Sequence, residues 1–152
     1  MNNIFSLECL FDEISNKIKE NSNLEDLKYI LELYIGEDWK KYVKYNNERY
    51  NKILILRNEF IELFIICWNE NQESKIHDHP LNGCLLKCLE GHLIEDIFIN
   101  KNSKIEYKSS NNITKNNIGY QSGNILLHKI KSQVNSVSLH IYSPPNFKIN
   151  YY

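Results

Sequence analysis

The sequence has little arginine and no long hydrophobic run, and these shortages exclude several classes of protein. Arg49 and Arg57 are its only arginines and its formal net charge is −1, so a basic surface for nucleic acid or an anionic membrane is not expected. No apolar stretch approaches the roughly 20 residues that a transmembrane helix needs. Residues 1–8 lack the positive and apolar regions of a secretory signal, which predicts a cytoplasmic protein.

The cysteines bear on the cellular compartment. Four cysteines are present, at positions 9, 67, 84 and 88, and they could form disulfides. Because no secretory signal is visible, we expect reduced thiols in a cytosol. The length of 152 residues is enough to bury a core, and neither a repeat nor a linker interrupts it. We therefore expect a single domain over residues 1–152.

The hydrophobic pattern predicts helices followed by strands. Over about residues 6–46, apolar residues recur at spacings of three and four, which indicates helices with one face on a core. Asn23 is a candidate N-cap of the second helix and Gly36 its end, and residues 37–45 predict a third, short helix. Over about residues 50–145, segments rich in Ile, Leu and Phe predict strands. This order favours a mainly β protein of the α+β class, but it does not by itself select a barrel.

The strongest functional signal is His77-Asp78-His79. In an extended segment side chains alternate, so His77 and His79 share a face and stand about 6–7 Å apart at the backbone, and Asp78 points the other way. Both imidazoles can then reach one metal ion. Two unrelated surface histidines are the alternative, but with only five histidines in the chain we favour a metal site. The pattern does not name the metal, since imidazole suits Zn, Fe, Ni and Cu.

A turn and a strand follow this histidine pair. The segment Pro80–Gly83 is a turn signal because Asn-Gly readily takes positive φ, and Cys84 to Glu90 reads as a strand that Gly91 ends. The segment resembles the first metal motif of the cupin family: His-x-His, three or four residues, Glu, six residues, Gly. Cys84 stands at the position of the Glu, which resembles cysteine dioxygenase, a cupin with three histidine ligands and no carboxylate.

Further segments carry the same resemblance, which runs from about residue 6 to about 145. They are Cys67-Trp68 before Ile76-His-Asp-His79, Leu127-His128-Lys129, Val137 to Pro145, and Arg49-Tyr50-Asn51-Lys52. The resemblance implies a cupin-type small β-barrel behind the N-terminal helices. It also implies mononuclear non-haem Fe(II) held by His77, His79 and His128. Without it, His128 alone would be interpreted as a satisfied core histidine.

Ser138, His140 and Tyr142 alternate along one predicted strand and therefore share a face. Spacing alone fits a buried structural Tyr and His equally well. The resemblance implies that this row points at the metal, with the phenol near the substrate and His140 orienting it. It also implies a thioether crosslink between Cys84 and Tyr142, for which a buried free thiol is the alternative. His92, Cys67, Cys88 and Trp68 are interpreted as structural.

One residue departs from the family at the substrate. The family holds the substrate carboxylate with an Arg, whose place is taken here by Lys52, while Tyr50 matches a tyrosine that contacts the same carboxylate. Lys offers a point charge where Arg offers a planar, bidentate fork. Lys52 therefore binds the carboxylate more weakly, or Arg57 replaces it, or the substrate differs.

The resemblance implies a monomeric thiol dioxygenase that oxidises L-cysteine with O₂ to cysteine sulfinic acid. One alternative is 3-mercaptopropionate or another thiol: Cys84 argues against 3-mercaptopropionate, because those relatives usually lack the crosslinking Cys, and Lys52 leaves it open. Another is a cupin that binds a metal or small ligand without oxygenase chemistry. A purely structural barrel, which binds no stoichiometric metal, is the last.

Overall fold

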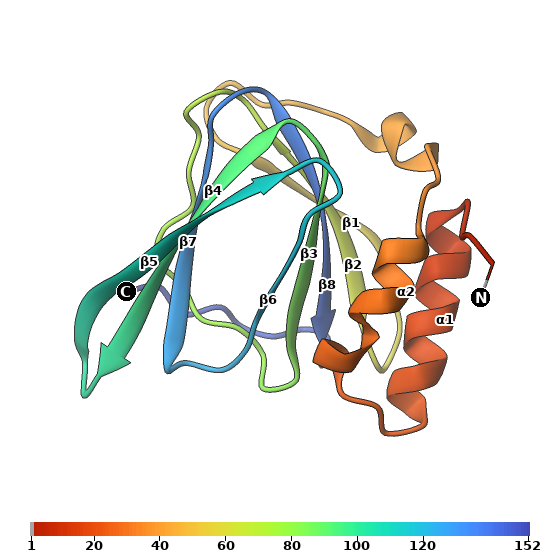
Figure 1. The fold of residues 1–152 in the computed structure, drawn as a ribbon, viewed down its shortest axis with the longest axis horizontal. Coiled ribbons are helices and arrows are strands. Elements are labelled where there is room, and N and C mark those ends of the chain that lie inside the picture. The colour runs from red at the N-terminus through yellow and green to blue at the C-terminus, as the bar shows by residue number, and fades with distance from the viewer. Residues whose placement is uncertain (1) are drawn as a thin grey trace.

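The computed structural model describes residues 2–152, and its N-terminal part is helical (Figure 1). It contains the α-helices α1 (Leu7–Lys19) and α2 (Lys28–Leu33) and the 3-10 helices η1 (Leu24–Leu27) and η2 (Asp38–Tyr42). The second predicted helix is thus a 3-10 turn continued by a short α-helix, and the third is 3-10. Asn23 stands at the predicted N-cap but makes no side-chain capping bond. Within the described residues, no helix has the length and apolarity needed to cross a membrane.

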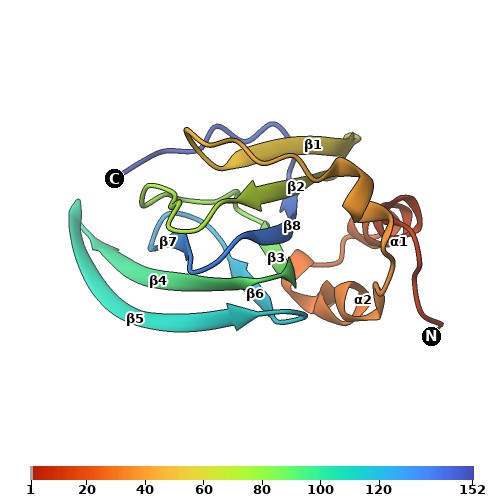
Figure 2. The same cartoon turned by 90° about the horizontal axis from the view of Figure 1, so that it is seen from above.

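Eight antiparallel strands follow and form two sheets that face each other, as Figure 2 shows. They are β1 (Asn51–Arg57), β2 (Glu62–Trp68), β3 (Gly83–Glu90), β4 (His92–Lys101), β5 (Lys104–Thr114), β6 (Ile118–Gln121), β7 (Leu126–Ser132) and β8 (Ser136–Ser143). The larger sheet has the order β1-β2-β8-β3-β6 and the smaller one β5-β4-β7. The predicted mainly β fold with N-terminal helices is confirmed. The sheets form a jelly roll and do not close into a single barrel.

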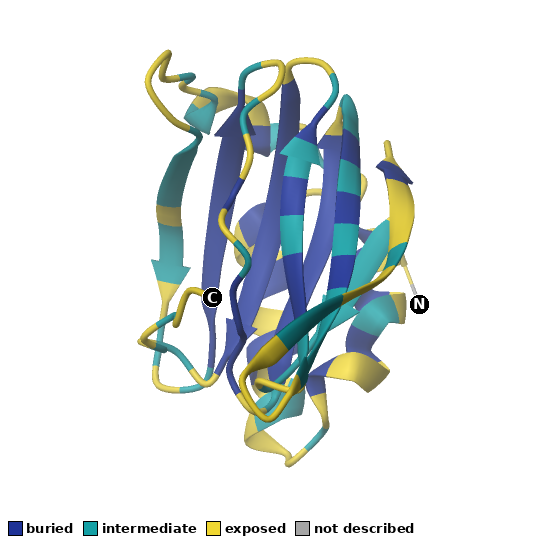
Figure 3. Cartoon of the chain, turned by 90° about the vertical axis from the view of Figure 1, so that its left-hand side faces the viewer, coloured by how far each residue is buried: buried dark blue, intermediate teal, exposed yellow. Residues whose placement is uncertain are grey.

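The central strands β2 and β8 are buried along their whole length (Figure 3). Alternation sends their side chains to two different cores. The odd-numbered positions of both strands belong to a core shared with the helices: Leu63, Ile65, Cys67, Val137, Leu139 and Ile141. Even-numbered positions face the smaller sheet, among them Phe64, Ile66, Trp68 and Tyr142. The functional row predicted on β8 therefore points into the space between the two sheets.

The turn between β3 and β4 requires its glycine. Gly91 has φ +89°, and a Cβ at this position would collide with the side chain of Ser136. The Ser136 hydroxyl in turn accepts the backbone N–H of His92 at 3.0 Å. This close approach fixes the start of β4, the strand that supports the candidate metal centre from behind.

Asp38 joins the helical segment to itself. Its Oδ2 accepts the backbone N–H of Leu7, in the first turn of α1, at 2.8 Å, and its Oδ1 accepts the hydroxyl of buried Tyr34 at 2.7 Å. Burial and the adjacent Asp38 raise the pKa of Tyr34, which therefore stays a neutral donor. One carboxylate thus satisfies a donor at a helix N-terminus and a donor in the core.

The Asp38→Ala substitution should lower the free energy of unfolding by about 1–3 kcal/mol, because it leaves the Tyr34 hydroxyl without its partner. Urea denaturation would measure the change. Asp12→Ala, at an exposed position of α1, is the matched control and should change stability by less than about 0.5 kcal/mol. Equal effects of the two substitutions would contradict this account of Asp38.

Candidate metal centre

Backbone pairing brings three histidines together. His77 and His79 lie in the connection between β2 and β3, and His128 lies on β7. The N–H of His77 donates to the carbonyl of His128 at 3.0 Å, and the N–H of His128 returns a bond to the carbonyl of His77 at 3.3 Å. The predicted extended segment is therefore an isolated β-bridge against β7, which aligns its side chains with those of that strand.

The imidazole Nε2 atoms converge on one point. His128 Nε2 lies 2.9 Å from His79 Nε2 and 3.1 Å from His77 Nε2, and all three rings are buried. The candidate ligand atoms lie within 4.8 Å of one another. Two ligands at right angles, each about 2.1 Å from one ion, stand about 3.0 Å apart, so these separations suit a shared metal ion.

Hydrogen bonds on the far side of two rings decide where their protons lie. His77 Nδ1 donates to the carbonyl of Lys75 at 2.7 Å, and His128 Nδ1 donates to Glu95 Oε1 at 2.8 Å. In the neutral rings the two Nε2 atoms then carry lone pairs that face each other, an arrangement that a cation between them stabilises. His79 Nδ1 is buried without a hydrogen-bond partner in residues 2–152. This donor set fits a metal ion.

Burial keeps the three rings neutral. It lowers the pKa of His77 below the usual value for histidine, and it lowers the pKa values of His79 and His128 further. Neutral imidazole is the form that binds a metal, so the site does not have to release protons at neutral pH. Burial also raises the pKa of Glu95, which accepts longer bonds from the amides of Asn111 and Gln121, each at 3.4 Å.

A second row of side chains faces the histidines from β8. Trp68 Nε1 donates to Ser138 Oγ at 3.0 Å, and Ser138 Oγ lies 2.8 Å from His140 Nε2. The Ser138 hydroxyl accepts the indole N–H and still has its own proton to donate to His140 Nε2; in that arrangement the proton of neutral His140 is on Nδ1. That Nδ1 lies 3.9 Å from Cys84 Sγ. Cys84 is in turn the cross-strand partner of Tyr142 in the pairing of β3 with β8.

Lys52 is a cation without an anion. Its Nζ lies 4.4 Å from the ring centre of Phe64 and 4.5 Å from that of Tyr142, and it has no ion-pair partner within residues 2–152. Burial lowers its pKa, while nearby Cys84 and Glu62 act in the opposite direction. Arg57, the other candidate for the carboxylate, is bound to Glu62 at 2.7 Å and does not line the cavity.

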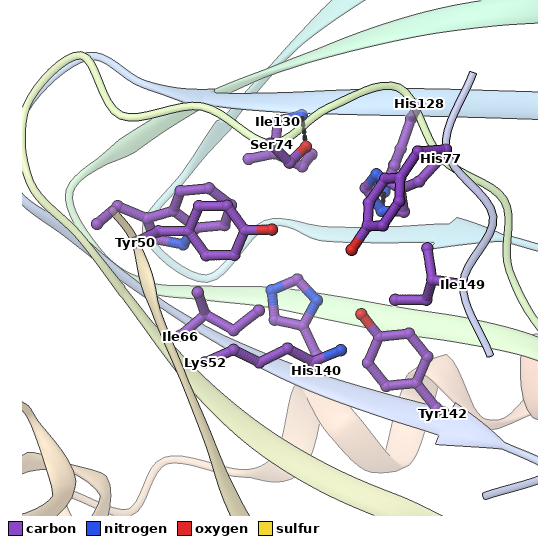
Figure 4. Close-up of a pocket in the computed structure, with 12 residues that line it drawn as sticks. Tyr50, Lys52, Ile66, Ser74, His77, His128, Ile130, His140, Tyr142 and Ile149 are labelled. Carbon is purple, nitrogen blue, oxygen red and sulfur yellow. Dashed lines mark hydrogen bonds between the residues drawn. The ribbon is translucent and has the colours of Figure 1, made fainter. Parts of the chain in front are cut away.

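These groups surround a cavity of about 50 Å³ (Figure 4). Figure 4 shows Lys52, His140 and Tyr142 on one side and His77 with His128 across from them. Tyr50 lies at another edge of the cavity, with its ring stacked on Trp68 at 4.5 Å between centres. Typical pockets for drug-sized ligands measure about 300–1,000 Å³, so this space suits only a small molecule beside a metal ion.

The family model for cysteine dioxygenase type I matches residues 10–152. The chain belongs to the cysteine dioxygenase type I family. Cysteine dioxygenase type 1 of Homo sapiens is 35% identical over 132 residues, covering 81% of this chain and 66% of the human protein. The cysteine dioxygenase type 1 of Danio rerio is 31% identical over 151 residues, covering 92% of this chain and 75% of its own length. The chain thus matches slightly less than two thirds of the human relative.

Solved structures agree on the fold. A Klebsiella pneumoniae protein with a double-stranded β-helix domain superposes with a TM-score of 0.58 at 15% identity, covering 74% of this chain and 86% of its own. At that identity the likeness concerns the fold alone, and it matches a cupin jelly roll. Family membership and the three-histidine cluster together support a metal cofactor in this cysteine dioxygenase family member.

The positions of two carboxylates, Glu95 and Asp78, and the hydrogen bond of Trp68 were not predicted from the sequence. Glu95 lies on β4 between Leu93 and Ile97, both buried on the same face, and an acid between two apolar residues at i±2 was the signal for it. Asp78 was only noted as pointing away from the metal, where it is in fact buried. Trp68 was interpreted as structural, but it lines the cavity and donates to Ser138. His92 instead bonds Asn112, away from the cluster.

The Glu95→Gln substitution should weaken metal binding by roughly 10–100-fold. A neutral amide orients the His128 ring less firmly and makes its Nε2 a weaker electron-pair donor to a metal ion. Competition between the protein and a chromophoric chelator for Zn²⁺ would measure the affinity. The control is Glu106→Gln on the exposed strand β5, which should leave it unchanged. An unchanged affinity in Glu95→Gln would show that the contact is not part of the metal centre.

The metal-free protein should lose stability as the pH falls below about 6.5. Above that pH the buried histidines are neutral in both the folded and unfolded chain. Below it the unfolded chain takes up protons that the buried rings, with their lowered pKa values, do not bind, so the unfolding free energy falls. The expected slope is at most about 1.4 kcal/mol per pH unit for each histidine. Urea denaturation between pH 7.5 and 5 would measure it, and an equal slope in His140→Gln would contradict the contribution of His140.

Proposed function

We propose that this protein is a thiol dioxygenase that oxidises L-cysteine with O₂ to cysteine sulfinic acid at an Fe(II) centre. The proposal rests on the convergence of three neutral imidazoles, in a member of the cysteine dioxygenase family, opposite a half-buried lysine that has no anionic partner within residues 2–152. In a substrate that has both a thiol and a carboxylate, the thiol would face the imidazoles and the carboxylate would face the lysine. The sulfur of the thiol takes up both atoms of O₂, so the reaction needs no external reductant.

His77, His79 and His128 would hold the iron through their Nε2 atoms. Bound Fe(II) would supply the redox chemistry that lets the thiolate and O₂ react side by side. The chain supplies the orientation: Glu95 and the carbonyl of Lys75 hold the outer nitrogens of His128 and His77, so that these two rings keep their lone pairs on the ion.

Lys52 and Tyr50 would bind the carboxylate of the substrate. Lys52 lines the cavity, and its ammonium faces the rings of Phe64 and Tyr142. A substrate carboxylate would compensate this ammonium for the hydration that it loses on burial. Tyr50 can donate its hydroxyl to the same group, because burial raises its pKa and keeps it protonated. This charge favours L-cysteine and 3-mercaptopropionate over thiols that lack a carboxylate.

Tyr142 would donate a hydrogen bond to the reacting substrate. Burial holds its pKa well above the usual range for tyrosine, so the phenol remains a donor. A Ser138 hydroxyl that accepts from Trp68 and donates to His140 Nε2 would leave the His140 proton on Nδ1, the nitrogen that lies 3.9 Å from Cys84 Sγ. This arrangement supports the proposal that Ser138, His140 and Tyr142 have catalytic roles.

We further propose that the thioether between Cys84 and Tyr142 forms during turnover. The two residues are cross-strand partners, and burial raises the pKa of the Cys84 thiol to about 12, which protects it from other electrophiles. The bond joins Sγ to a ring carbon, and the two hydrogens lost, with their electrons, reduce O₂ to hydrogen peroxide. A purified protein lighter by two hydrogens, mapped to these two peptides, is the expected observation.

Oxygen uptake by the Fe(II)-loaded protein tests the function. L-Cysteine, 3-mercaptopropionate and cysteamine would be supplied separately and each product identified by mass. We expect uptake with L-cysteine, one O₂ per sulfinate formed. Uptake with another thiol alone would retain the chemistry and change the substrate. No uptake with any thiol at full iron occupancy would leave a metal-binding cupin without oxygenase activity.

Lys52→Met tests how the carboxylate is bound. We expect KM for L-cysteine to rise by roughly 10–100-fold, because a charge-assisted bond is lost, while kcat/KM for cysteamine, which has no carboxylate, does not fall. Lys52→Arg restores the charge with a planar fork and should recover most of the loss. The assignment fails if Lys52→Met affects both thiols equally.

A further inference from the structure

The segment that follows β8 forms one wall of the cavity. Residues 146–152, called the strap below, leave the end of β8 and return to the connection that carries His77 and His79. Ile149 and Tyr151 line the cavity, whereas Lys148 and Asn150, between and beside them, are exposed. Figure 4 shows Ile149 between Tyr142 and His77. The alternation of an extended chain thus directs two strap side chains inward.

Asp78 fastens the distal end of the strap. Its carboxylate is buried, and both oxygens bond to the strap: Oδ1 accepts the backbone N–H of Asn150 at 2.8 Å, and Oδ2 accepts Asn150 Nδ2 at 2.8 Å and the Tyr152 hydroxyl at 3.2 Å. Two backbone bonds join the same segments, from Asp78 N–H to the carbonyl of Asn150 and from Tyr152 N–H to the carbonyl of Ile76. His77 and Tyr151 form a β-bridge there.

The proximal end of the strap is held separately. The N–H of Asn146 donates to Glu62 Oε2 at 3.3 Å, and Glu62 is itself fixed by its ion pair with Arg57. The strap is therefore tied at one end to β2 and at the other to the histidine connection. Its middle, around Ile149, spans the cavity between these two attachments. A segment tied at both ends is a wall of defined position.

We infer that Asp78 is a positioning residue that fastens the strap, and that Tyr151 on the strap sets the size of the thiol that the cavity accepts. The inference rests on the proposed thiol dioxygenase function and names the selectivity of that site. Asp78 lies between two histidines whose side chains point to the metal, so alternation turns its carboxylate away from the metal and onto the strap. Both carboxylate oxygens accept hydrogen bonds from the strap, and a residue that faces solvent would not need these bonds.

Tyr151 is placed to select by size. The centre of the Tyr151 ring lies 6.4 Å from the centre of the His77 ring. The ammonium of Lys75 lies 5.7 Å from the centre of the same Tyr151 ring. Tyr151 lines the cavity although it is 57% exposed, so its side chain lies at the border between the cavity and solvent. The cavity is small, about 50 Å³, and a thiol with one more methylene than L-cysteine is expected to meet this ring. Hydrophobic pockets discriminate one methylene by roughly 10–200-fold.

Tyr151→Ala tests the size limit on the Fe(II)-loaded protein. The ratio of kcat/KM for L-cysteine to that for DL-homocysteine should fall by roughly tenfold or more, since the wall recedes from the longer thiol. Lys148→Ala, on the same strap with its side chain exposed, is the matched control and should keep the wild-type ratio. An unchanged ratio in Tyr151→Ala would overturn the role of Tyr151.

Asp78→Asn and Asn150→Ala test the fastening without any turnover. Amide hydrogen exchange of metal-free protein should become roughly tenfold faster at Tyr152 in both variants, and at Asn150 in Asp78→Asn, with no change in α1. Unchanged exchange at these amides would overturn the fastening. In the iron-loaded form, Asn150→Ala should raise KM for L-cysteine by roughly tenfold with kcat within about twofold of wild type, as expected when a wall loosens and the reacting groups stay in place.

The two readouts separate failure of this inference from failure of the proposed function. If wild-type protein oxidises no thiol, the thiol dioxygenase proposal fails, and the exchange experiment still decides whether Asp78 fastens the strap. If wild-type protein oxidises L-cysteine but the variants alter neither exchange nor selectivity, the strap inference fails alone. Should Asp78→Asn not fold, Asn150→Ala removes the same bond from the exposed side.

Discussion

The candidate site depends on one pair of backbone hydrogen bonds, between His77 and His128. These bonds place a short connection against β7, 51 residues away in sequence, and so set the distance and direction of the imidazoles that meet there. Glu95 comes from β4, the neighbour of β7, and holds His128 from behind. The other groups of the cavity are positioned relative to this cluster by the two sheets and by the strap. The hydrogen bonds between Ser74 and Ile130 and the β-bridge of Glu73 with Lys131 hold the same connection against β7 beside this pair.

In the larger sheet, β8 contributes to a hydrophobic core on one face and to the candidate site on the other. Alternation places Val137, Leu139 and Ile141 in the core under the helices and Ser138, His140 and Tyr142 on the opposite face, where His140 and Tyr142 line the cavity. Burial on both faces excludes water from the polar row, which strengthens its hydrogen bonds and keeps its groups neutral. The helices therefore contribute to the chemistry indirectly, by covering the back of the strand that carries it.

Much of the fold could be predicted because it follows from local periodicity. The shared face of His77 and His79, the row on β8 and the order of helices and strands are properties of alternation and of apolar spacing. Helix was predicted at both short segments, but its 3-10 form was not, because the form and ends of such short helices depend on tertiary contacts such as Asp38 with Leu7. Glu95, Asp78 and the second role of Trp68 were missed for the same reason: their partners are His128, Asn150 and Ser138, which lie on other strands or on the strap. Lys52 was identified by position, but only the structure shows that it lacks a counter-ion within the described residues.

The position of Asp78 between two candidate ligands couples two events that are usually treated apart. One carboxylate bonds the strap, and its own backbone fixes the spacing of His77 and His79, so an ordered strap and a correctly spaced ligand pair stabilise each other. Thermodynamic linkage is reciprocal: if an ordered strap favours ion binding by some factor, ion binding favours strap order by the same factor. Under the proposed function, a thiol that contacts the strap would favour ion binding by the same linkage. Substrate and ion would thus act as each other's effectors through a single side chain.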